Sequence, residues 1–338
     1  MHQKTKKLNF PLIFTASFLL VFSLTSCGFF NEKKAEKITK TEFLLDTVVS
    51  VTVYDEADSE AVDECIALCA DYEKLFSRTD PESELYALNA SGGMAVSDEL
   101  LGLIETALYY CELSDGRFDI TMGAVSEAYG FSSVSPSLPS AEFIAEALSH
   151  TGYEKITIDG NTVTLTDPEA VIDLGAIAKG YIADRLGELL RERGVENAII
   201  DLGGNILCLG NKPDGSDFKV GIQYPYRGSN ISITSAAISN MSVVTSGVYQ
   251  RYFEAEGKTY HHILDPETGY SLNNGLLSVS IISENSVDCD ALSTTVFALG
   301  LEDGMELVNS LENVWAVFIT EDMDIIYSEG FEDMFTKK

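Results

Sequence analysis

The segment from Asp173 to Tyr181 constrains the fold more than any other part of this sequence. It reads Asp-Leu-Gly-Ala-Ile-Ala-Lys-Gly-Tyr and follows a β-branched apolar run at 170–172, which predicts a buried strand. The chain turns at Gly175 and continues as an amphipathic helix. Asp173 and Lys179 are therefore expected at a helix N-terminus, whose free N–H groups suit a phosphate with a metal nearby. The alternative is an ordinary Asp N-cap with Lys179 in solvent.

The order of the remaining patterns indicates an α+β protein of mixed helices and strands. Neither strict βαβ alternation nor an all-β pattern is present, and an antiparallel-leaning sheet is expected. Helical patterns cover 59–76, 83–89, 98–113, 140–149, 176–193, 287–300 and 303–311, and a further short helix follows the loop 114–123. Strand patterns cover 43–54, 153–159, 162–166, 170–174, 197–202, 205–209, 218–224, 229–235, 241–246, 248–256, 314–320 and 324–328.

The N-terminus carries the features of an export signal. A basic start, a nearly unbroken apolar run at 8–24 and the sequence Leu24-Thr25-Ser26-Cys27 predict a signal peptide over residues 1–26. The ending resembles the bacterial lipoprotein box, in which the cysteine is lipidated. We therefore expect lipidation at Cys27, a polar tether over 27–40, a domain over 41–338 and anchoring on the extracytoplasmic face of the cell membrane. A plain signal peptide with a chance cysteine is the alternative.

The charge of the chain excludes one class of partner and sets a condition on ligands. The formal net charge is −31, so the surface lacks the cations that non-specific binding of nucleic acid requires. An anionic ligand would need a local cationic device, either a metal ion or well-placed Lys and Arg side chains.

A carboxylate and a hydroxyl share one helical face near the C-terminal third of the chain. Asp290 and Thr294 are four residues apart at the start of a helical pattern, so their oxygens point the same way. Hard oxygen donors of this kind suit Mg²⁺, which keeps positions open for water and substrate phosphate. The alternative is a helix N-terminal Asp with a Thr packed behind it.

Three further segments could approach a ligand. His261 and His262 are adjacent in an extended segment, so only one of them can face a given site. Glycine-marked junctions at 201–205 and 245–249 could bring the backbone close to a flat ligand. Each segment is equally explained as a turn or hairpin.

Taken together and in this order, the motifs resemble the ApbE family of FAD:protein FMN transferases. The resemblance runs from about Phe43 to Tyr327. It rests on seven collinear motifs: Ser83-Glu-Leu, Gly116-Arg-Phe-Asp119, the 173–181 segment, Gly203-Gly-Asn205, Thr245-Ser-Gly-Val-Tyr249, His262-Ile-Leu-Asp-Pro266 and Asp290-Ala-Leu-Ser-Thr294. It implies two intimately packed sub-domains with a T-fold-like core and FAD in the cleft between them.

The resemblance also implies roles for individual residues. A metal, Mg²⁺ or Mn²⁺, would be held by the Ala176 carbonyl with the Asp290 and Thr294 side chains. FAD would contact Phe118, Asp119, Asp173, Lys179 and Ile263, with His262 at the reacting phosphates. Where some members have a Met-Gly-Thr run, this chain has Leu45-Asp46-Thr47, so Leu45 enters the expected FAD site, and Tyr249 or Phe118 could be the stacking partner of the isoalloxazine ring.

The implied reaction is metal-dependent transfer of FMN from FAD to a Thr or Ser hydroxyl, with release of AMP. His262 is interpreted as the general base or orienting group for that hydroxyl. The family's acceptor signature is absent from this chain, so an exported acceptor flavoprotein is expected as the partner. Two alternatives remain open, an FAD pyrophosphatase that yields FMN and AMP and a non-catalytic flavin-binding lipoprotein.

Overall fold

The computed structural model describes residues 37–335, apart from 55–58, 132, 134, 227, 229 and 230. These described residues belong to one compact unit. The expected signal peptide, Cys27 and most of the expected tether lie outside the described residues. Within the described part of the chain, no helix is long and apolar enough to cross a bilayer.

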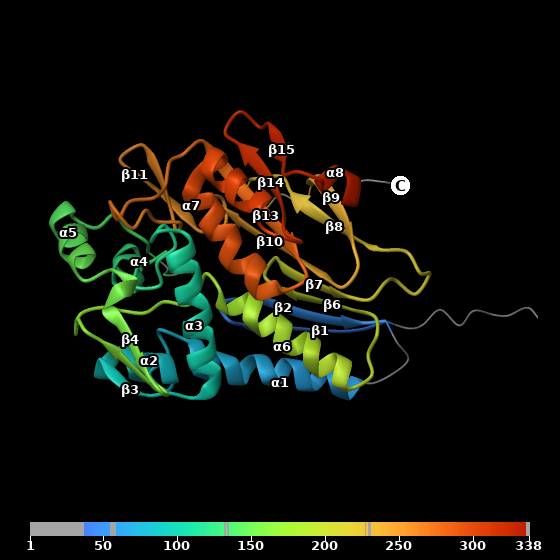
Figure 1. Ribbon diagram of the computed structural model, residues 1–338, viewed down its shortest axis with the longest axis horizontal. Helices are drawn as coiled ribbons and strands as arrows, with labels where there is room; N and C mark the ends of the chain where they lie inside the picture. The colour runs from blue at the N-terminus through green and yellow to red at the C-terminus, as the bar shows by residue number, and fades with distance from the viewer. Residues whose placement is uncertain are drawn as a thin grey trace, which may run out of the picture. The chain divides into compact units, whose positions relative to one another are not determined.

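An eight-stranded sheet forms the centre of this unit, and every pair of neighbouring strands is antiparallel. This arrangement confirms the α+β class and the antiparallel-leaning sheet (Figure 1). In spatial order the strands are β1 (Ile38–Leu44), β2 (Thr47–Val53), β6 (Ala198–Leu202), β7 (Asn205–Leu209), β10 (Met241–Gly247), β13 (Leu276–Ser283), β14 (Trp315–Thr320) and β15 (Ile325–Tyr327).

The two faces of this sheet are covered by different kinds of structure. Helices α1 (Ser59–Phe76), α6 (Ala178–Glu192) and α7 (Ser286–Ser310) pack on one face, where Val244 and Ile281 join the main hydrophobic core. The side chains of Val243 and Ile282 point to the opposite face, because successive side chains of a strand alternate. There they join a second core with the hairpin of β8 (Phe218–Gln223) and β9 (Ser232–Ile238) and with α8 (Phe331–Phe335).

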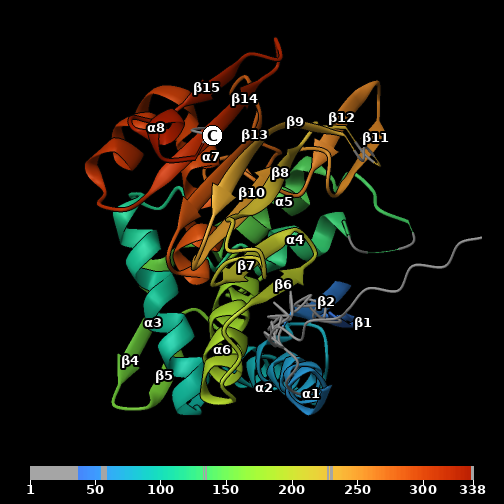
Figure 2. The same cartoon turned by 90° about the vertical axis from the view of Figure 1, so that its right-hand side faces the viewer.

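The rest of the described chain lies beside α1 and α7 and is mainly helical (Figures 1 and 2). A three-stranded antiparallel sheet in the order β3-β5-β4 and the hairpin of β11 and β12 complete it. The elements are α2 (Glu84–Ser91), β3 (Gly93–Ala95), α3 (Asp98–Leu113), α4 (Gly123–Tyr129), α5 (Ala141–Ser149), the 3₁₀ turn η1 (Tyr153–Lys155), β4 (Ile156–Asp159), β5 (Thr162–Leu165), β11 (Tyr252–Ala255) and β12 (Lys258–His261).

The strand expected at 43–54 is wrong in one respect, because the chain forms a hairpin there. Leu45 and Asp46 have φ angles of 55° and 56°, as a two-residue hairpin turn requires. The Leu45 N–H donates a hydrogen bond of 3.0 Å to Glu73 Oε1, which holds the turn against α1. Since β1 begins at Ile38, the last three residues of the expected tether belong to the sheet.

Two other expectations about strands also need correction. The run at 170–174 is not a strand, because only Val171 forms a bridge there, with Met122. Strand β13 was not predicted, since its serines interrupt the apolar alternation although Ser278 and Ser280 are fully buried. The helices expected at 287–300 and 303–311 are the two halves of α7, which is kinked at Gly300.

Candidate active site

A cavity of about 830 Å³ lies where the segment 173–182, the start of α7 and the loop 117–122 meet. Such a volume falls within the range of ligand and cofactor pockets. The structure brings nearly all the expected site residues to its wall, the exception being Tyr249. The lining residues among them are Leu45, Phe118, Asp119, Asp173, Ala176, Lys179, His262, Ile263, Asp290 and Thr294.

Asp290 is held in the wall by the beginning of helix α6. Its Oδ2 atom accepts a hydrogen bond of 2.9 Å from the backbone N–H of Gly180. Its Oδ1 atom lies 3.5 Å from Lys179 Nζ. The Asp290 side chain is 5% exposed, and its Oδ1 atom faces the Lys179 ammonium rather than a backbone N–H group. A buried charge in this setting calls for a positive partner.

The bond from Gly180 to Asp290 also frees a backbone acceptor. In a continued helix, the Gly180 N–H would donate to the carbonyl four residues earlier, which is that of Ala176. Because α6 begins only at Ala178, and because Gly180 donates to Asp290, no described residue donates a hydrogen bond to the Ala176 carbonyl. Ala176 lines the cavity, so its backbone oxygen is available to a ligand.

Thr294 lies one turn after Asp290 and belongs to a cluster of hydroxyl groups. Its Oγ1 is 3.0 Å from Ser246 Oγ on strand β10, and Ser246 Oγ is 2.8 Å from Ser293 Oγ. Ser293 donates in turn to the Asp290 carbonyl at 2.9 Å. The cluster fixes the Thr294 hydroxyl on the cavity side of the helix. A carboxylate, a hydroxyl and a free carbonyl together form the hard oxygen donor set that suits Mg²⁺.

Asp173 and Lys179 lie in the wall, as expected, and each has a defined partner. Asp173 Oδ1 accepts from the Gly175 N–H at 2.9 Å, and its Oδ2 accepts from Arg78 Nε at 3.1 Å. Lys179 Nζ donates to the Gly175 carbonyl at 3.1 Å. These contacts order the turn that precedes α6 and leave the Lys179 ammonium between Gly175 and Asp290.

The loop that carries Phe118 and Asp119 is rigidly organised. Asp119 accepts hydrogen bonds from the Thr121 N–H at 2.7 Å, the Thr121 hydroxyl at 2.6 Å and the Tyr153 N–H at 3.1 Å. Burial raises the pKa of Asp119, and these bonds act against that rise. Phe118 is 3% exposed and packs edge-on against Tyr110, so most of its ring lies in the core.

His262 rather than His261 faces the cavity. Its pKa is lowered to about 3 by burial first and then by the positive charge of Arg251, so the imidazole is neutral near pH 7. Its Nδ1 atom is buried without a hydrogen-bond partner among the described residues. His261 lies on the other side of the strand, where its Nε2 contacts the Leu272 carbonyl at 2.8 Å. A neutral imidazole with a free nitrogen can accept a proton.

Tyr249 and Leu45 were both considered for the flavin ring, and the structure places them differently. Tyr249 is 7% exposed, lies outside the cavity lining and packs its ring against Gly247. Leu45 lines the cavity from the tip of the β1–β2 turn. Leu45 and Phe118 therefore both reach the cavity, whereas Tyr249 does not in this conformation.

Sequence reasoning missed three of the cationic side chains around the cavity. Arg78, Arg117 and Arg251 line it together with Lys179. The Arg78 side chain is 16% exposed and also contacts Glu127 at 2.9 Å. Arg117 interacts with Asp265 and Glu267. The signal for Arg117 was present, since it lies inside the Gly116-Arg-Phe-Asp119 motif, but Arg78 and Arg251 stand in no pattern that marks them.

Comparisons with known proteins agree with one another over most of the chain. The family model described as the ApbE family matches residues 45–319. A FAD:protein FMN transferase of Klebsiella pneumoniae (strain 342) is 38% identical over 280 residues, which cover 81% of this chain and 86% of that protein. A protein of the same name from Treponema pallidum (strain Nichols) is 33% identical over 330 residues, 91% of each chain.

Solved structures show the same architecture. The flavin transferase ApbE from Vibrio cholerae matches with a TM-score of 0.79 and 27% identity, over 89% of this chain and 99% of that one. The ApbE protein from Thermotoga maritima matches with a TM-score of 0.81 and 32% identity, over 88% of this chain and 99% of that one. The cavity therefore belongs to an architecture that several solved proteins share.

Proposed function

The chain belongs to the ApbE family, and from that premise we propose that it transfers FMN from FAD to a threonine or serine hydroxyl of an acceptor flavoprotein. In this reaction the hydroxyl oxygen attacks the FMN-side phosphorus of FAD. The bond from that phosphorus to the bridging oxygen breaks, and AMP leaves with the bridging oxygen. The hydroxyl proton passes to a base, and the acceptor keeps FMN in a phosphodiester bond.

The observation that carries the proposal is the oxygen-donor set of Ala176, Asp290 and Thr294, which lies in a cavity wall beside Lys179. A simple flavin-binding protein would not need a cation site within a wall that also supplies ammonium and guanidinium groups for a pyrophosphate. The same donor set explains how a chain with a net charge of −31 could bind a dianionic substrate, because a metal ion held there would supply positive charge.

The residues present fit a divalent metal, and we propose Mg²⁺, with Mn²⁺ as a substitute. Within the described part of the chain, the Ala176 carbonyl has no other donor, and the one ionic partner of Asp290 Oδ1 within 4 Å is the Lys179 ammonium. Asp290, Thr294 and the Ala176 carbonyl would hold the ion, which would neutralise pyrophosphate charge and stabilise the leaving AMP.

His262 is proposed to receive the proton of the acceptor hydroxyl or to orient that group. Its pKa of about 3 in the free protein keeps it neutral, so Nδ1 or Nε2 can accept a proton. The pyrophosphate of bound FAD would place negative charge near an imidazole whose present neighbours include Arg251 and Lys179. That charge would raise the pKa of His262 and make it a stronger base in the complex than in the free protein.

Export and lipid anchoring belong to the same proposal. The sequence ending in Cys27 and the polar residues after it would place the catalytic domain at the extracytoplasmic face of the membrane. Expression of the chain and of Cys27→Ala in a bacterium, followed by fractionation and labelling with palmitate, tests this part. Label and membrane association should both be lost in the variant; their persistence would contradict anchoring at Cys27.

The reaction is tested with residues 28–338, FAD, Mg²⁺ and an acceptor domain that carries the family's Thr motif. The intact mass of the acceptor and the AMP released are measured together. An acceptor gain of one FMN with matching AMP, lost with EDTA and restored by Mg²⁺, supports the transferase. Free FMN and AMP without acceptor modification would point to an FAD pyrophosphatase, and unchanged bound FAD would point to a binding protein.

A further inference from the structure

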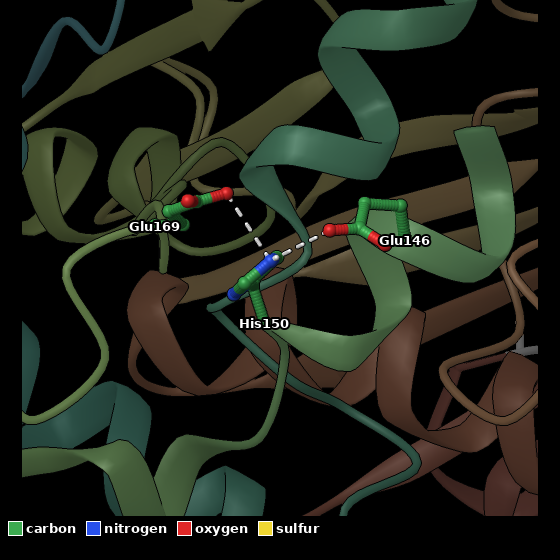
Figure 3. Close-up of side chains that lie close together, drawn as sticks. All are labelled: Glu146, His150 and Glu169. Atoms are coloured by element: carbon green, nitrogen blue, oxygen red, sulfur yellow. Dashed lines mark ion pairs between the residues drawn. The ribbon is translucent and has the colours of Figure 1, made fainter.

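A cluster of three metal-ligating side chains lies outside the cavity, on helix α5 and the turn after β5. Glu146 and His150 are four residues apart at the C-terminal end of α5, so both face the same side. Glu169 reaches the same point from the turn at 167–169 (Figure 3). One ligand atom from each residue lies within 4.8 Å of the other two. None of these residues lines the FAD cavity.

Two of the three distances between these atoms are close to those of a metal coordination shell. His150 Nε2 lies 3.2 Å from Glu169 Oε2 and 3.7 Å from Glu146 Oε1. Two ligands that are each about 2.1 Å from a tetrahedral Zn²⁺ ion are about 3.4 Å apart. The two observed separations therefore bracket the expected spacing. The third separation, between the carboxylate oxygens of Glu146 and Glu169, is within 4.8 Å, so these two side chains would close around an ion.

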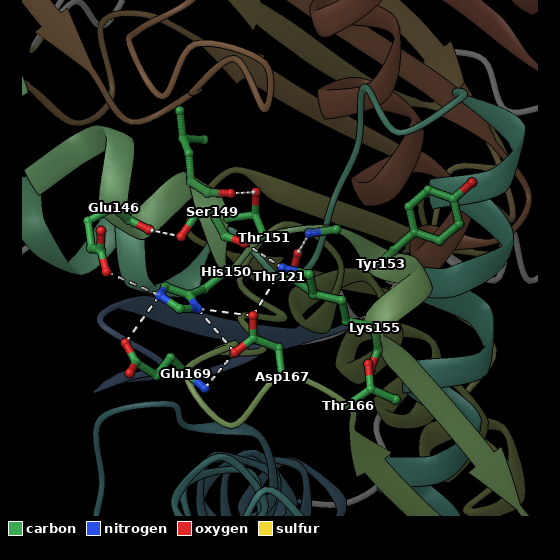
Figure 4. Close-up of polar contacts among 12 residues, drawn as sticks. Thr121, Glu146, Ser149, His150, Thr151, Tyr153, Lys155, Thr166, Asp167 and Glu169 are labelled. Carbon is green, nitrogen blue, oxygen red and sulfur yellow. Dashed lines mark hydrogen bonds and ion pairs between the residues drawn. The ribbon is translucent and has the colours of Figure 1, made fainter. Parts of the chain in front are cut away.

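A carboxylate orients the imidazole of His150 through its Nδ1 atom, the ring nitrogen on the side away from Glu146 and Glu169, as in many zinc sites. Its Nδ1 lies 3.0 Å from both oxygens of Asp167. Asp167 is itself held by the Glu169 N–H at 3.0 Å and by Lys155 Nζ at 3.1 Å (Figure 4). A carboxylate that binds one imidazole nitrogen fixes the tautomer and directs the other nitrogen at the metal.

The second nitrogen of His150 faces two carboxylates without a hydrogen bond to either. Nε2 is buried and makes no hydrogen bond within the described part of the chain, although two carboxylates flank it. A protonated Nε2 would direct its N–H at one acceptor, whereas the two carboxylates stand on either side of it (Figure 3). Two carboxylates that converge on one imidazole nitrogen call for positive charge between them, which a divalent cation bound by all three groups would supply.

We propose that Glu146, His150 and Glu169 bind a Zn²⁺ ion, with Asp167 as a positioning residue. Imidazole nitrogen with carboxylate oxygen favours zinc over magnesium, which prefers oxygen ligands alone. The ion would join the end of α5 to the turn that precedes Asp173. Three protein ligands leave a fourth position for water.

A metal ion at this site would stabilise the cavity wall through residues that lie outside the cavity. The residues after His150 donate backbone hydrogen bonds to the loop of Asp119, from Gly152 N–H to Thr121 Oγ1 at 2.7 Å and from Tyr153 N–H to Asp119 Oδ2 at 3.1 Å. A metal that fixes His150 therefore limits the movement of the loop that carries Phe118 and Asp119. The ion stabilises the wall and takes no part in the proposed transfer of FMN.

The test is equilibrium dialysis of the tag-free chain, residues 28–338, against Zn²⁺ at pH 7.5, in an Asp290→Ala background that removes the expected cavity site. The unfolding temperature is measured with and without the ion. One bound equivalent and a rise of several degrees are expected. Both should be lost in His150→Gln and in the double variant Glu146→Gln, Glu169→Gln, whose side chains are exposed and therefore not needed for folding.

Glu142→Gln is the matched control, because Glu142 is exposed on the same helix and its change removes the same charge without removing a ligand. It should keep the bound equivalent and the rise in unfolding temperature. The proposal is overturned if no Zn²⁺ binds in the Asp290→Ala background, or if binding persists unchanged in the His150→Gln and double variants.

Discussion

Helices α6 and α7 each place one carboxylate against the first turn of the other, and the two carboxylates differ in how many hydrogen bonds they accept. Asp184 on α6 accepts hydrogen bonds of 2.8 Å from the N–H groups of Ser286 and Val287 at the start of α7, one to each oxygen. Asp290 on α7 accepts one bond, from Gly180 at the start of α6, and its second oxygen faces the cavity near Lys179. The contacts are reciprocal, but only Asp290 retains an oxygen for a ligand.

This difference predicts, without reference to any relative, that Asp184 has a structural role and Asp290 a functional one. Both side chains lie at a helix N-terminus, where backbone N–H groups attract negative charge. Both oxygens of Asp184 accept a backbone N–H of α7, so this side chain joins the two helices. Asp290 joins the two helices through one oxygen only, and its other oxygen faces the cavity. We therefore expect loss of Asp184 to cost mainly stability and loss of Asp290 to cost mainly activity.

The largest effect on stability is expected where the two helices touch. A Cβ atom on Gly180 would lie 2.3 Å from the Ser286 carbonyl oxygen and 2.7 Å from Val287 Cα, both backbone atoms. Gly180→Ala should therefore force the helices apart and lower the free energy of unfolding by about 2 to 3 kcal/mol, measured by urea denaturation. Both carboxylate contacts would be disturbed together.

Gly187→Ala on the same helix is the control for that prediction. Its added Cβ would meet the end of the Leu207 side chain at 3.0 Å, which can move. The free energy of unfolding should stay within about 1 kcal/mol of the parent, because the helix also gains intrinsic propensity. Equal losses in the two variants would mean that close approach at Ser286 does not matter.

A smaller loss is expected from Asp184→Ala. The change leaves the N–H groups of Ser286 and Val287 without their acceptor, and a lost cap costs about 1 to 2 kcal/mol. Urea denaturation at pH 7 measures it. A variant as stable as the parent would contradict the structural role given to Asp184.

The smallest effect is the pH dependence of that same loss. Burial raises the pKa of Asp184 to about 6, so between pH 4 and pH 6 the folded protein holds a proton that the unfolded chain has released. The resulting stabilisation is complete at low pH and is lost as the pH rises through 6. Asp184→Ala should therefore cost more at pH 4 than at pH 7, by on the order of 1 kcal/mol. The same cost at both values would refute the raised pKa.

Elements with strong periodicity could be predicted from the sequence almost to the residue. Helices α1 and α3 have the predicted bounds, because both carry long apolar stripes, and Ser97 caps α3. The β1–β2 turn could not be predicted, since Leu45 and Asp46 lack the Asn-Gly chemistry of such turns and owe their geometry to the contact with Glu73. Strand β13 was not recognised because buried serines interrupt its apolar pattern, and one of them, Ser280, bonds across to Thr245 on β10 at 2.7 Å.

The cavity was predicted better than the sheet, because its residues come from short motifs that keep their order. Those motifs gave Asp290, Thr294 and His262 before any geometry was available. Arg78 could not be found in this way, since its role depends on a contact with Asp173 across 95 residues of sequence. The freed carbonyl of Ala176 was implied only by resemblance; the structure supplies its physical reason in the bond from Gly180 to Asp290.

The most direct test of the account is single-turnover transfer of FMN to an acceptor domain by Asp290→Ala and Asp184→Ala. Both are assayed at saturating FAD and Mg²⁺ and at a temperature where both are fully folded. We predict that Asp290→Ala slows transfer by at least about 100-fold, since it removes a proposed metal ligand, and that Asp184→Ala stays within about threefold of the parent. Similar rates in the two variants would contradict the assignment of Asp290 as the functional carboxylate of the pair.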